Sequence, residues 1–194
     1  SATQFQYDYL NDDIDDYGNI DYSITNKLPK NLRQYIIDST KKNEKKILVL
    51  INPPYAEATN AENISSNTNS QIKSGVSKTK VSSTIMADYG KSSNELFTQF
   101  IARIQKEIPN AILAIFSKLK YVNAPNFELF REKWKAHYLD GFIVHSKAFD
   151  GIKGDFPIGF LIWDTGKKES INKITTTAYN KNSEWVGEKS YYNL

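Results

Sequence analysis

The feature that most constrains the fold is an uninterrupted apolar run, Ile47–Ile51, which ends abruptly in Asn52-Pro53-Pro54-Tyr55. Such a run of β-branched and leucine residues is typical of a strand buried on both faces of a parallel sheet. Binding sites in open α/β sheets lie at the carboxyl ends of these strands, where this tetrapeptide stands. At average residue frequencies, a chain of 194 residues contains this tetrapeptide by chance on the order of once in a thousand cases. The alternative interpretation is a proline-rich turn that only closes the strand.

The segments around this run predict an α/β sheet in a single domain over residues 1–194. Helices are expected over Leu28–Lys42, from a capping box at Ser92–Glu95 to about Ile108, and from Asn126 to about Tyr138. Further strands are expected at Phe5–Leu10, Ala111–Phe116, Gly141–His145 and Ile158–Trp163, with a hairpin or extended arm at Ile174–Tyr179 and Glu184–Tyr192.

The order of these segments predicts how the strands run. The connection between the strands at 141–145 and 158–163 is too short for a crossover helix, so this pair is expected to be antiparallel. The sheet should therefore be mostly parallel, with one reversed strand near the C-terminus. A long polar loop is expected at about 56–92, and a C-terminal extension at about 165–194.

Composition excludes several kinds of site. The chain has no cysteine and only two histidines, His137 and His145, which rules out a thiol nucleophile and a cysteine- or multi-histidine metal centre. No apolar run approaches the roughly 20 residues that span a bilayer, and no secretory leader opens the chain. We therefore expect a cytoplasmic protein without a membrane partner. A net charge of +3 is too small to indicate nucleic acid by itself.

An acidic stretch after residue 10 has part of the spacing of a calcium-binding loop. Asp13, Asp15 and Gly18 fall at suitable positions, but the fifth position is Tyr17 and the twelfth is Ile24, where a bidentate Glu is required. A solvated loop is the better interpretation of this stretch.

The residues at positions 52–55 favour activation of an exocyclic amino group. Such a group on a heteroaromatic base is a poor nucleophile, because its lone pair is delocalised into the ring. The Asn52 side-chain oxygen and the Pro53 carbonyl could accept hydrogen bonds from its two hydrogens and so free the lone pair. Pro53 and Pro54 restrict the backbone and hold both acceptors in place. Tyr55 offers an aromatic face on which the base can stack.

This tetrapeptide, the strand before it and the segments after it resemble the DNA adenine-N6 methyltransferases of restriction–modification systems. The resemblance covers roughly Phe5 to Asp164. It implies a partial Rossmann-like methyltransferase fold, S-adenosylmethionine as cofactor, double-stranded DNA as partner and transfer of a methyl group to the N6 of a flipped adenine. By this resemblance, Asn52 and Pro53 hold the adenine amino group, Pro54 belongs to the same catalytic tetrapeptide, and Tyr55 stacks on the extruded ring. No metal is implied for methyl transfer.

The resemblance also implies contacts outside the tetrapeptide. Asp8-Tyr9 matches the acidic–aromatic pair that contacts the adenine of the cofactor, and Phe149 matches the aromatic that packs on the opposite side of the flipped base. From the residues alone, Asp8 is equally well an acid of a solvated loop, and Tyr9 and Phe149 are equally well core aromatics.

The chain departs from the family on the cofactor side. Family members carry a glycine-containing loop and a ribose-binding acid before the acidic–aromatic pair, but here that pair stands at positions 8–9 and no Gly-x-Gly occurs. We therefore expect a fragment of a larger methyltransferase that alone neither binds S-adenosylmethionine tightly nor methylates DNA. The edge of Ile47–Ile51 should then be covered by Phe5–Leu10, by self-association with another copy of the chain, or by neighbours in a crystal.

Other functions remain open. A methyltransferase with the same tetrapeptide could act on a protein glutamine amide, which presents a similar planar NH₂ group. A non-catalytic interaction module would use the tetrapeptide only as a turn. A nuclease is the weakest alternative, because the Glu44-Lys45-Lys46 pattern stands in a lysine-rich helix exit where such patterns arise readily.

Several basic residues have two interpretations. A phosphate path could be lined by Lys118, Lys120, Arg131, Lys133 and Lys135. The acids Glu128 and Glu132 among them favour a solvated helix face instead. The loop at 73–80 could close over DNA or serve as a linker. His145, at a strand end, is more typical of a structural residue than of a base.

Overall fold

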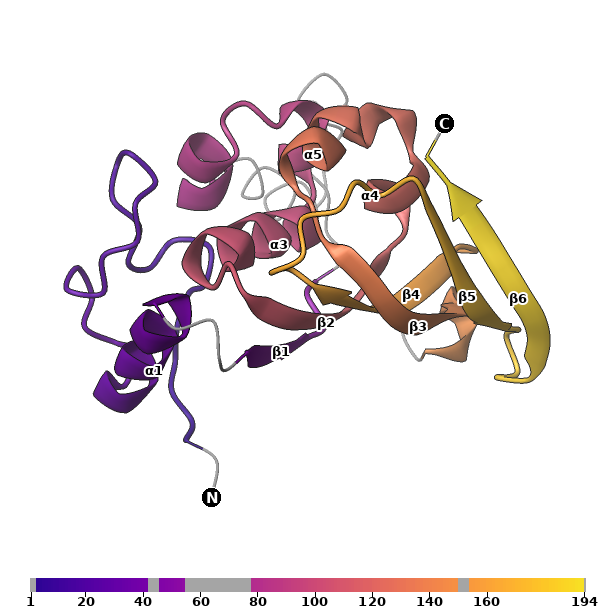
Figure 1. The fold of residues 1–194 in the computed structure, drawn as a ribbon, viewed down its shortest axis with the longest axis horizontal. Coiled ribbons are helices and arrows are strands. Elements are labelled where there is room, and N and C mark those ends of the chain that lie inside the picture. Colours follow the sequence, from indigo (N-terminus) through magenta and orange to yellow (C-terminus); the bar gives the residue numbers. More distant parts are fainter. Residues whose placement is uncertain (1–2, 42–45, 55–77, 150–153, 194) are drawn as a thin grey trace, which may run out of the picture. The chain divides into compact units, whose positions relative to one another are not determined.

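The computed structural model describes residues 3–41, 46–54, 78–149 and 154–193 (Figure 1). The chain divides into two compact units. Unit 1 consists of Ser1–Ile47 and Ala56–Asn110, and unit 2 of Leu48–Tyr55 and Ala111–Leu194. Among the described residues, no helix is long and apolar enough to cross a membrane.

Unit 1 is helical. It contains α1 (Lys30–Lys41), the π-helix η2 (Val81–Ile85), the 3₁₀ helix η3 (Gly90–Asn94) and α3 (Leu96–Glu107). The two long helices confirm the expected amphipathic helices. The prediction of a polar loop up to residue 92 is wrong at its C-terminal end, because η2 and η3 lie inside it and Val81 and Met86 are fully buried. Residues 55–77 of that loop lie outside the described residues.

The start of α3 differs from the expected capping box. Its N-cap is Glu95, and no side chain makes the capping hydrogen bond. Ser92 lies within η3 and its hydroxyl donates to the carbonyl of Tyr89 at 2.8 Å, so this hydroxyl is not used on the first turn of α3. The Thr98 hydroxyl instead donates back to the Glu95 carbonyl at 2.8 Å. The preceding 3₁₀ turn therefore leads into the helix.

The strand predicted at Phe5–Leu10 is wrong. Residues 3–8 have no regular secondary structure, and the carbonyl of Asp8 accepts hydrogen bonds from the Asn11 and Asp12 amides in a turn. The aromatic side chains of this segment pack against α3: the rings of Tyr7 and Tyr9 lie 5.3 and 4.3 Å from the guanidinium carbon of Arg103. The aromatic residues that alternate with polar ones in this segment therefore pack on a helix distant in the sequence, and they do not pair in a sheet.

Unit 2 is built on a six-stranded sheet with the strand order β1-β2-β4-β3-β5-β6. The strands are β1 (Ile47–Ile51), β2 (Ala111–Lys118), β3 (His137–His145), β4 (Pro157–Asp164), β5 (Lys173–Tyr179) and β6 (Trp185–Tyr192). Short helices α4 (Lys120–Asn123), η4 (Pro125–Phe127) and α5 (Glu128–Lys133) connect β2 to β3, and η5 (Ser146–Ala148) follows β3.

The sheet is mixed, which confirms the α/β class. β4 pairs antiparallel with both β2 and β3, as expected for the short β3–β4 connection. β5 pairs parallel with β3, and β6 pairs antiparallel with β5. The prediction named one reversed strand, and β6 is a second one. The C-terminal hairpin therefore extends the sheet beside β3 and is not a separate arm.

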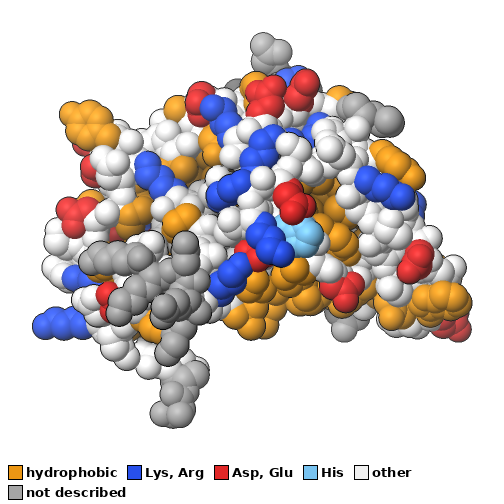
Figure 2. All heavy atoms as spheres, viewed as in Figure 1, with side chains coloured by type: hydrophobic (Ala, Val, Ile, Leu, Met, Phe, Trp, Pro, Cys, Tyr) orange, Lys and Arg blue, Asp and Glu red, His pale blue; other side chains and the backbone are white. Residues whose placement is uncertain are grey.

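β1 stands at one end of the strand order, and it is not buried on both faces as expected. Its exposure alternates along the strand, and Leu48 and Leu50 are each 65% exposed. Within the described chain no strand pairs with its outer edge, so a covering strand at Phe5–Leu10 is also ruled out. In Figure 2, hydrophobic side chains gather at the lower centre, over the sheet of unit 2.

An aromatic cluster forms the core between the connecting helices and the sheet of unit 2. The Trp163 ring centroid lies 5.1 Å from that of Trp134 and 5.3 Å from that of Tyr138, and the Trp163 Nε1–H donates to the Tyr121 hydroxyl at 3.0 Å.

The helix predicted from Asn126 to about Tyr138 is wrong at both ends. α5 has Phe127 as its N-cap and ends at Lys133, and Tyr138 belongs to β3.

Candidate functional site

Asn52, Pro53 and Pro54 follow directly after β1, as the sequence predicts. Pro53 is buried, whereas Asn52 and Pro54 are exposed. A buried proline limits movement of the backbone on either side of it, and Asn52 lies next to it at the surface. Tyr55, the fourth residue of the tetrapeptide, lies outside the described residues.

The carboxyl ends of β2 and β3 lie at the same edge of the sheet. Both strands run antiparallel to β4, so Lys118 is opposite Ile158 and His145 is opposite Pro157. The segments that follow β2 and β3 and the one that precedes β4 therefore meet at this edge. Edges of this kind are where α/β sheets bind ligands.

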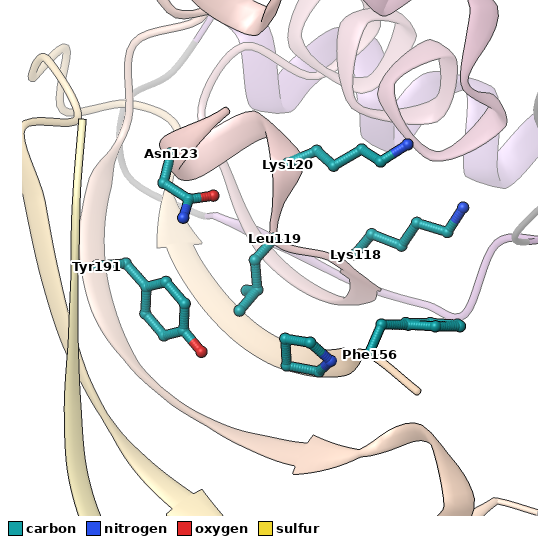
Figure 3. Close-up of a pocket in the computed structure, with 7 residues that line it drawn as sticks. Lys118, Leu119, Lys120, Asn123, Phe156 and Tyr191 are labelled. Carbon is teal, nitrogen blue, oxygen red and sulfur yellow. The ribbon is translucent and has the colours of Figure 1, made fainter. Parts of the chain in front are cut away.

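Two cavities open at this edge and share three lining residues, Phe156, Pro157 and Tyr191. The first has a volume of about 330 Å³ and is completed by Lys118, Leu119, Lys120 and Asn123 (Figure 3). The second has a volume of about 460 Å³ and extends along β3 and the β5–β6 hairpin. Because the two cavities share these three residues, we treat them as one site and call it the edge groove.

Tyr191 lies at the junction of the two cavities. Tyr191 is only 7% exposed, and its hydroxyl has no hydrogen-bond partner in the described structure. Burial raises the pKa of Tyr191 to about 12, so the hydroxyl is a neutral donor and acceptor at physiological pH. In Figure 3 the Tyr191 hydroxyl and the Asn123 amide both point toward the middle of the first cavity.

The loop after β3 is held by a small charged cluster. The Asp155 carboxylate pairs with Lys147 at 2.7 Å and lies 3.6 Å from His145 Nε2. The hydrogen bond from Lys147 lowers the pKa of Asp155. The other ring nitrogen of His145, Nδ1, accepts a hydrogen bond from the Lys147 amide at 3.1 Å. Both ring nitrogens of His145 thus face groups of its own loop, which agrees with a structural role for His145 and not with a role as a base.

Phe149 packs against the sheet. Its ring lies edge-on to Phe116, with 6.1 Å between the centroids, and Phe116 in turn contacts Phe142 and Phe160. Phe149 is half-buried at the end of this aromatic row. The described contacts do not bring it to Asn52, so its role against a flipped base remains a prediction.

Asp8 and Tyr9 belong to unit 1, whereas Asn52 and Phe149 belong to unit 2. The Asp8 carboxylate accepts hydrogen bonds from the Leu10 amide at 3.1 Å and from Asn11 Nδ2 at 2.9 Å. It is therefore already used to hold a turn.

The ring of Tyr9 is also engaged. It stacks on Phe100 at 5.6 Å between centroids, and the Arg103 guanidinium carbon lies 4.3 Å from its centroid. Burial, and then the nearby Glu107 carboxylate, raise the pKa of its hydroxyl. Phe100 and Arg103 thus both contact the ring of Tyr9, and its role toward the cofactor adenine remains a prediction.

The described residues contain no group of three or more histidine, aspartate or glutamate side chains placed to hold a metal ion. The acidic stretch instead forms local hydrogen bonds. The Asp13 carboxylate is fully buried, where it accepts hydrogen bonds from the amide and hydroxyl of Thr25 at 2.8 and 2.9 Å and from the Tyr7 hydroxyl at 3.0 Å. For Asp13, the interpretation as part of a solvated loop is therefore wrong.

No protein-family model and no curated protein matches this sequence. Among solved structures, the chain is similar to DrdV in its complex with DNA (TM-score 0.44, 13% identity) and to the ATP-dependent Type ISP restriction-modification enzyme LlaBIII bound to DNA (TM-score 0.40, 10% identity). It is also similar to a protein from Vibrio vulnificus YJ016 described as a modification subunit of a type I restriction enzyme (TM-score 0.42, 12% identity).

These are similarities of three-dimensional structure between proteins of low sequence identity. They cover 92%, 69% and 80% of this chain, respectively. The chain spans 18%, 10% and 31% of the three matched proteins, which is less than a third of each.

Sequence reasoning named Lys118, Lys120 and His145 but missed the other side chains of the edge groove. Asn123, Phe156 and Tyr191 carry no motif, and Tyr191 stands 73 positions after Lys118 in the sequence (191 − 118). Strand pairing places Tyr191 opposite Ile174, near the start of β5, and only the tertiary structure brings it into one cavity with Leu119, Asn123 and Pro157.

Proposed function

We propose that this chain is the catalytic segment of an S-adenosylmethionine-dependent DNA adenine-N6 methyltransferase of a restriction–modification system. The observation that carries the proposal is the position of Asn52-Pro53-Pro54 at the end of β1, with Pro53 buried and Asn52 exposed. The buried proline supports the proposal because it would fix the Pro53 carbonyl, one of the two acceptors, before the ligand arrives. A cytoplasmic location belongs to the same proposal.

In the proposed reaction, the Asn52 side-chain oxygen and the Pro53 carbonyl accept hydrogen bonds from the two hydrogens of the adenine amino group. These bonds orient the nitrogen and localise its lone pair for attack. Tyr55 and Phe149 would pack on the extruded base. S-adenosylmethionine would supply the methyl group, with Asp8 and Tyr9 as the candidates for contact with its adenine.

Two alternatives lead to different substrates. A protein glutamine amide offers two similar hydrogens to the same acceptors, without a base to stack. A non-catalytic module would use residues 52–54 only to end β1, so the identity of the Asn52 side chain would not matter for any ligand.

The first test asks whether binding depends on the adenine amino group. Single-stranded oligonucleotides avoid the cost of extruding a base from a duplex. We expect a thymidylate strand with one central adenine to bind about tenfold more tightly than the same strand with unsubstituted purine, because a lost hydrogen-bonded pair costs about 1.4 kcal/mol. We expect Asn52→Ala to reduce this difference severalfold, with the remainder contributed by the Pro53 carbonyl, as measured by fluorescence anisotropy without cofactor.

Asn126→Ala is the matched control, because Asn126 is an exposed asparagine of unit 2 that is not part of the tetrapeptide. It should retain the preference for adenine. Equal binding of the adenine and purine strands by the unmodified chain would contradict the proposal. Incubation with millimolar S-adenosylmethionine then separates the enzymes: mass spectrometry should find N6-methyladenine in DNA, whereas a methylated glutamine peptide would support the alternative substrate.

Cofactor binding by this chain alone should be weak. The chain contains no Gly-x-Gly, and the ring of Tyr9 is covered by Phe100 and Arg103. We expect isothermal titration calorimetry with S-adenosylmethionine or its demethylated product to show a Kd above about 1 mM, equivalent to less than about 4 kcal/mol of binding free energy. A micromolar Kd would show that other residues of the chain form an adenine-binding surface.

A further inference from the structure

The edge groove combines features that single out one class of ligand. Its first cavity has an apolar floor formed by Leu119 and Pro157, and two lysines, Lys118 and Lys120, line one side. In Figure 3 these two side chains run in the same direction, and their ammonium groups lie on the same side of the cavity as Phe156. A purely apolar ligand would gain nothing from two ammonium groups, whereas an anion with a flat body would contact both surfaces.

The polar groups on the other side of this cavity are suited to a heterocycle. The buried Tyr191 hydroxyl lacks a hydrogen-bond partner in the described structure, and a buried polar group without one is costly unless a ligand or water provides it. The Asn123 amide, which is half-buried, offers one acceptor and two donors beside it. Both point into the same space, so they could bind the polar edge of a base.

The size of the groove agrees with this chemistry. A cavity of about 330 Å³ is at the lower end of the range for small-molecule sites. The second cavity continues past Tyr191 and is lined by two further lysines, Lys181 and Lys189, and by one acid, Asp155, which is paired with Lys147. A path with cations at intervals and aromatic rings between them is typical of surfaces that follow a nucleic-acid strand.

The Lys118 ammonium lies 5.8 Å from the Phe156 ring centroid, so one site can contact both a phosphate and a base. We propose that the edge groove binds a nucleotide, with its phosphate at Lys118 and Lys120, its base against the apolar surface that includes Phe156, and the base edge at Tyr191 and Asn123. The nucleotide could be free or part of a DNA strand. This inference rests on the proposed function for its ligand class, but it concerns a site separate from residues 52–55 and needs neither adenine nor cofactor.

The probe is therefore a fluorescein-labelled strand of twelve thymidylates, which contains no adenine amino group. We expect the double variant Lys118→Gln/Lys120→Gln to bind it about tenfold more weakly at low salt. The slope of log K against log salt should also fall by roughly 1.4, because each phosphate contact to a single strand contributes about 0.7. We expect Tyr191→Phe, which keeps the ring, to weaken binding about threefold through loss of one hydrogen bond.

The matched control is Lys135→Gln/Lys167→Gln, which changes the net charge equally at the opposite edge of the sheet, just before β3 and just after β4. It should bind the strand nearly as tightly as the unmodified chain. Equal weakening by the two double variants, or no weakening by the first, would overturn the proposal. So would equally effective competition by a polyglutamate peptide, since the site would then recognise negative charge alone.

Titration with thymidine monophosphate identifies the source of the ligand. Binding that is lost in the Lys118→Gln/Lys120→Gln variant assigns the groove to free nucleotides, whereas binding of the twelve-residue strand alone assigns it to DNA. If the thymidylate strand binds as expected but the preference for adenine at Asn52 is absent, the proposed methyl transfer fails and the nucleotide site stands. The reverse result rejects the nucleotide site and leaves the proposed function intact.

Discussion

Replacing Arg103 with methionine is expected to destabilise unit 1 by about 3–5 kcal/mol, the range found when one partner of a buried ion pair is removed. Arg103 is fully buried, and its Nε pairs with the Glu107 carboxylate at 3.2 Å. Burial by itself lowers the pKa of Arg103, but Glu107 and the neighbouring tyrosines raise it above its ordinary value, so the side chain remains charged.

The guanidinium also connects the N-terminal segment to α3. It donates hydrogen bonds to the carbonyls of Tyr9 and Asp12 and, at 2.7 Å, to the hydroxyl of Tyr7. Methionine would leave these three oxygens without their donor and the Glu107 charge without its partner. The Tyr22 hydroxyl, which donates to Glu107 at 2.8 Å, cannot replace a positive charge. Unfolding should therefore begin with release of the segment at 7–25 from α3.

Hydrogen exchange followed by mass spectrometry can locate this effect, because peptides from residues 7–25 and 96–107 should exchange faster in Arg103→Met. Far-UV circular dichroism in urea gives the change in free energy. All three tryptophans lie in unit 2, so their fluorescence does not report on unit 1 directly. Lys106→Met, at an exposed position of α3, is the matched control and should change the stability by no more than about 0.5 kcal/mol.

A second variant tests the cause. Adding Glu107→Gln to Arg103→Met removes the uncompensated charge and should restore part of the lost stability. If the double variant is no more stable than Arg103→Met, the lost stability comes from the carbonyl contacts and not from the charge. Stability of Arg103→Met equal to that of the unmodified chain would contradict the prediction.

The second large effect is expected from Trp163→Ala in unit 2. Removing a buried large aromatic side chain typically costs about 3–5 kcal/mol, because the cavity that remains is only partly refilled. Trp163 is 1% exposed, and its ring contacts those of Trp134, Tyr138 and Tyr121. It thus joins β3, β4 and α4, the elements between which the aromatic core lies.

Two further variants separate packing from hydrogen bonding. Trp163→Phe keeps an aromatic ring but removes the Nε1–H that donates to Tyr121, so its cost should be smaller than that of alanine. Trp185→Ala removes a tryptophan that is 67% exposed and should change the stability by no more than about 0.5 kcal/mol. Urea unfolding followed by circular dichroism compares all three, and an equal loss in Trp185→Ala and Trp163→Ala would contradict the prediction.

Local patterns predicted much of the fold correctly. The apolar run before Asn52 identified β1, the proline after Ile108 marked the start of β2, and the short connection between β3 and β4 predicted an antiparallel pair. These features depend on neighbouring residues and on turn geometry, which a sequence contains directly.

Patterns failed where a distant contact determined the structure. The alternation in Phe5–Leu10 resembles a strand, yet its aromatic residues pack around Arg103, which is 94 positions away from Tyr9. The run in β1 resembles a strand buried on both faces, but β1 lies at the end of the sheet order, where Leu48 and Leu50 are exposed. The spacing of apolar residues along the sequence does not specify which part of the protein a side chain will pack against.

The candidate sites divide in the same way. The sequence by itself determined the strand-end tetrapeptide and the amino-group chemistry that it favours, because both reside in adjacent residues. Only the tertiary structure decided that Asp8 and Tyr9 are engaged within unit 1 and that Tyr191 reaches Phe156 and Lys118. The physical reason is that an edge groove forms from strands paired across the sheet, and this pairing depends on long-range packing that no local pattern specifies.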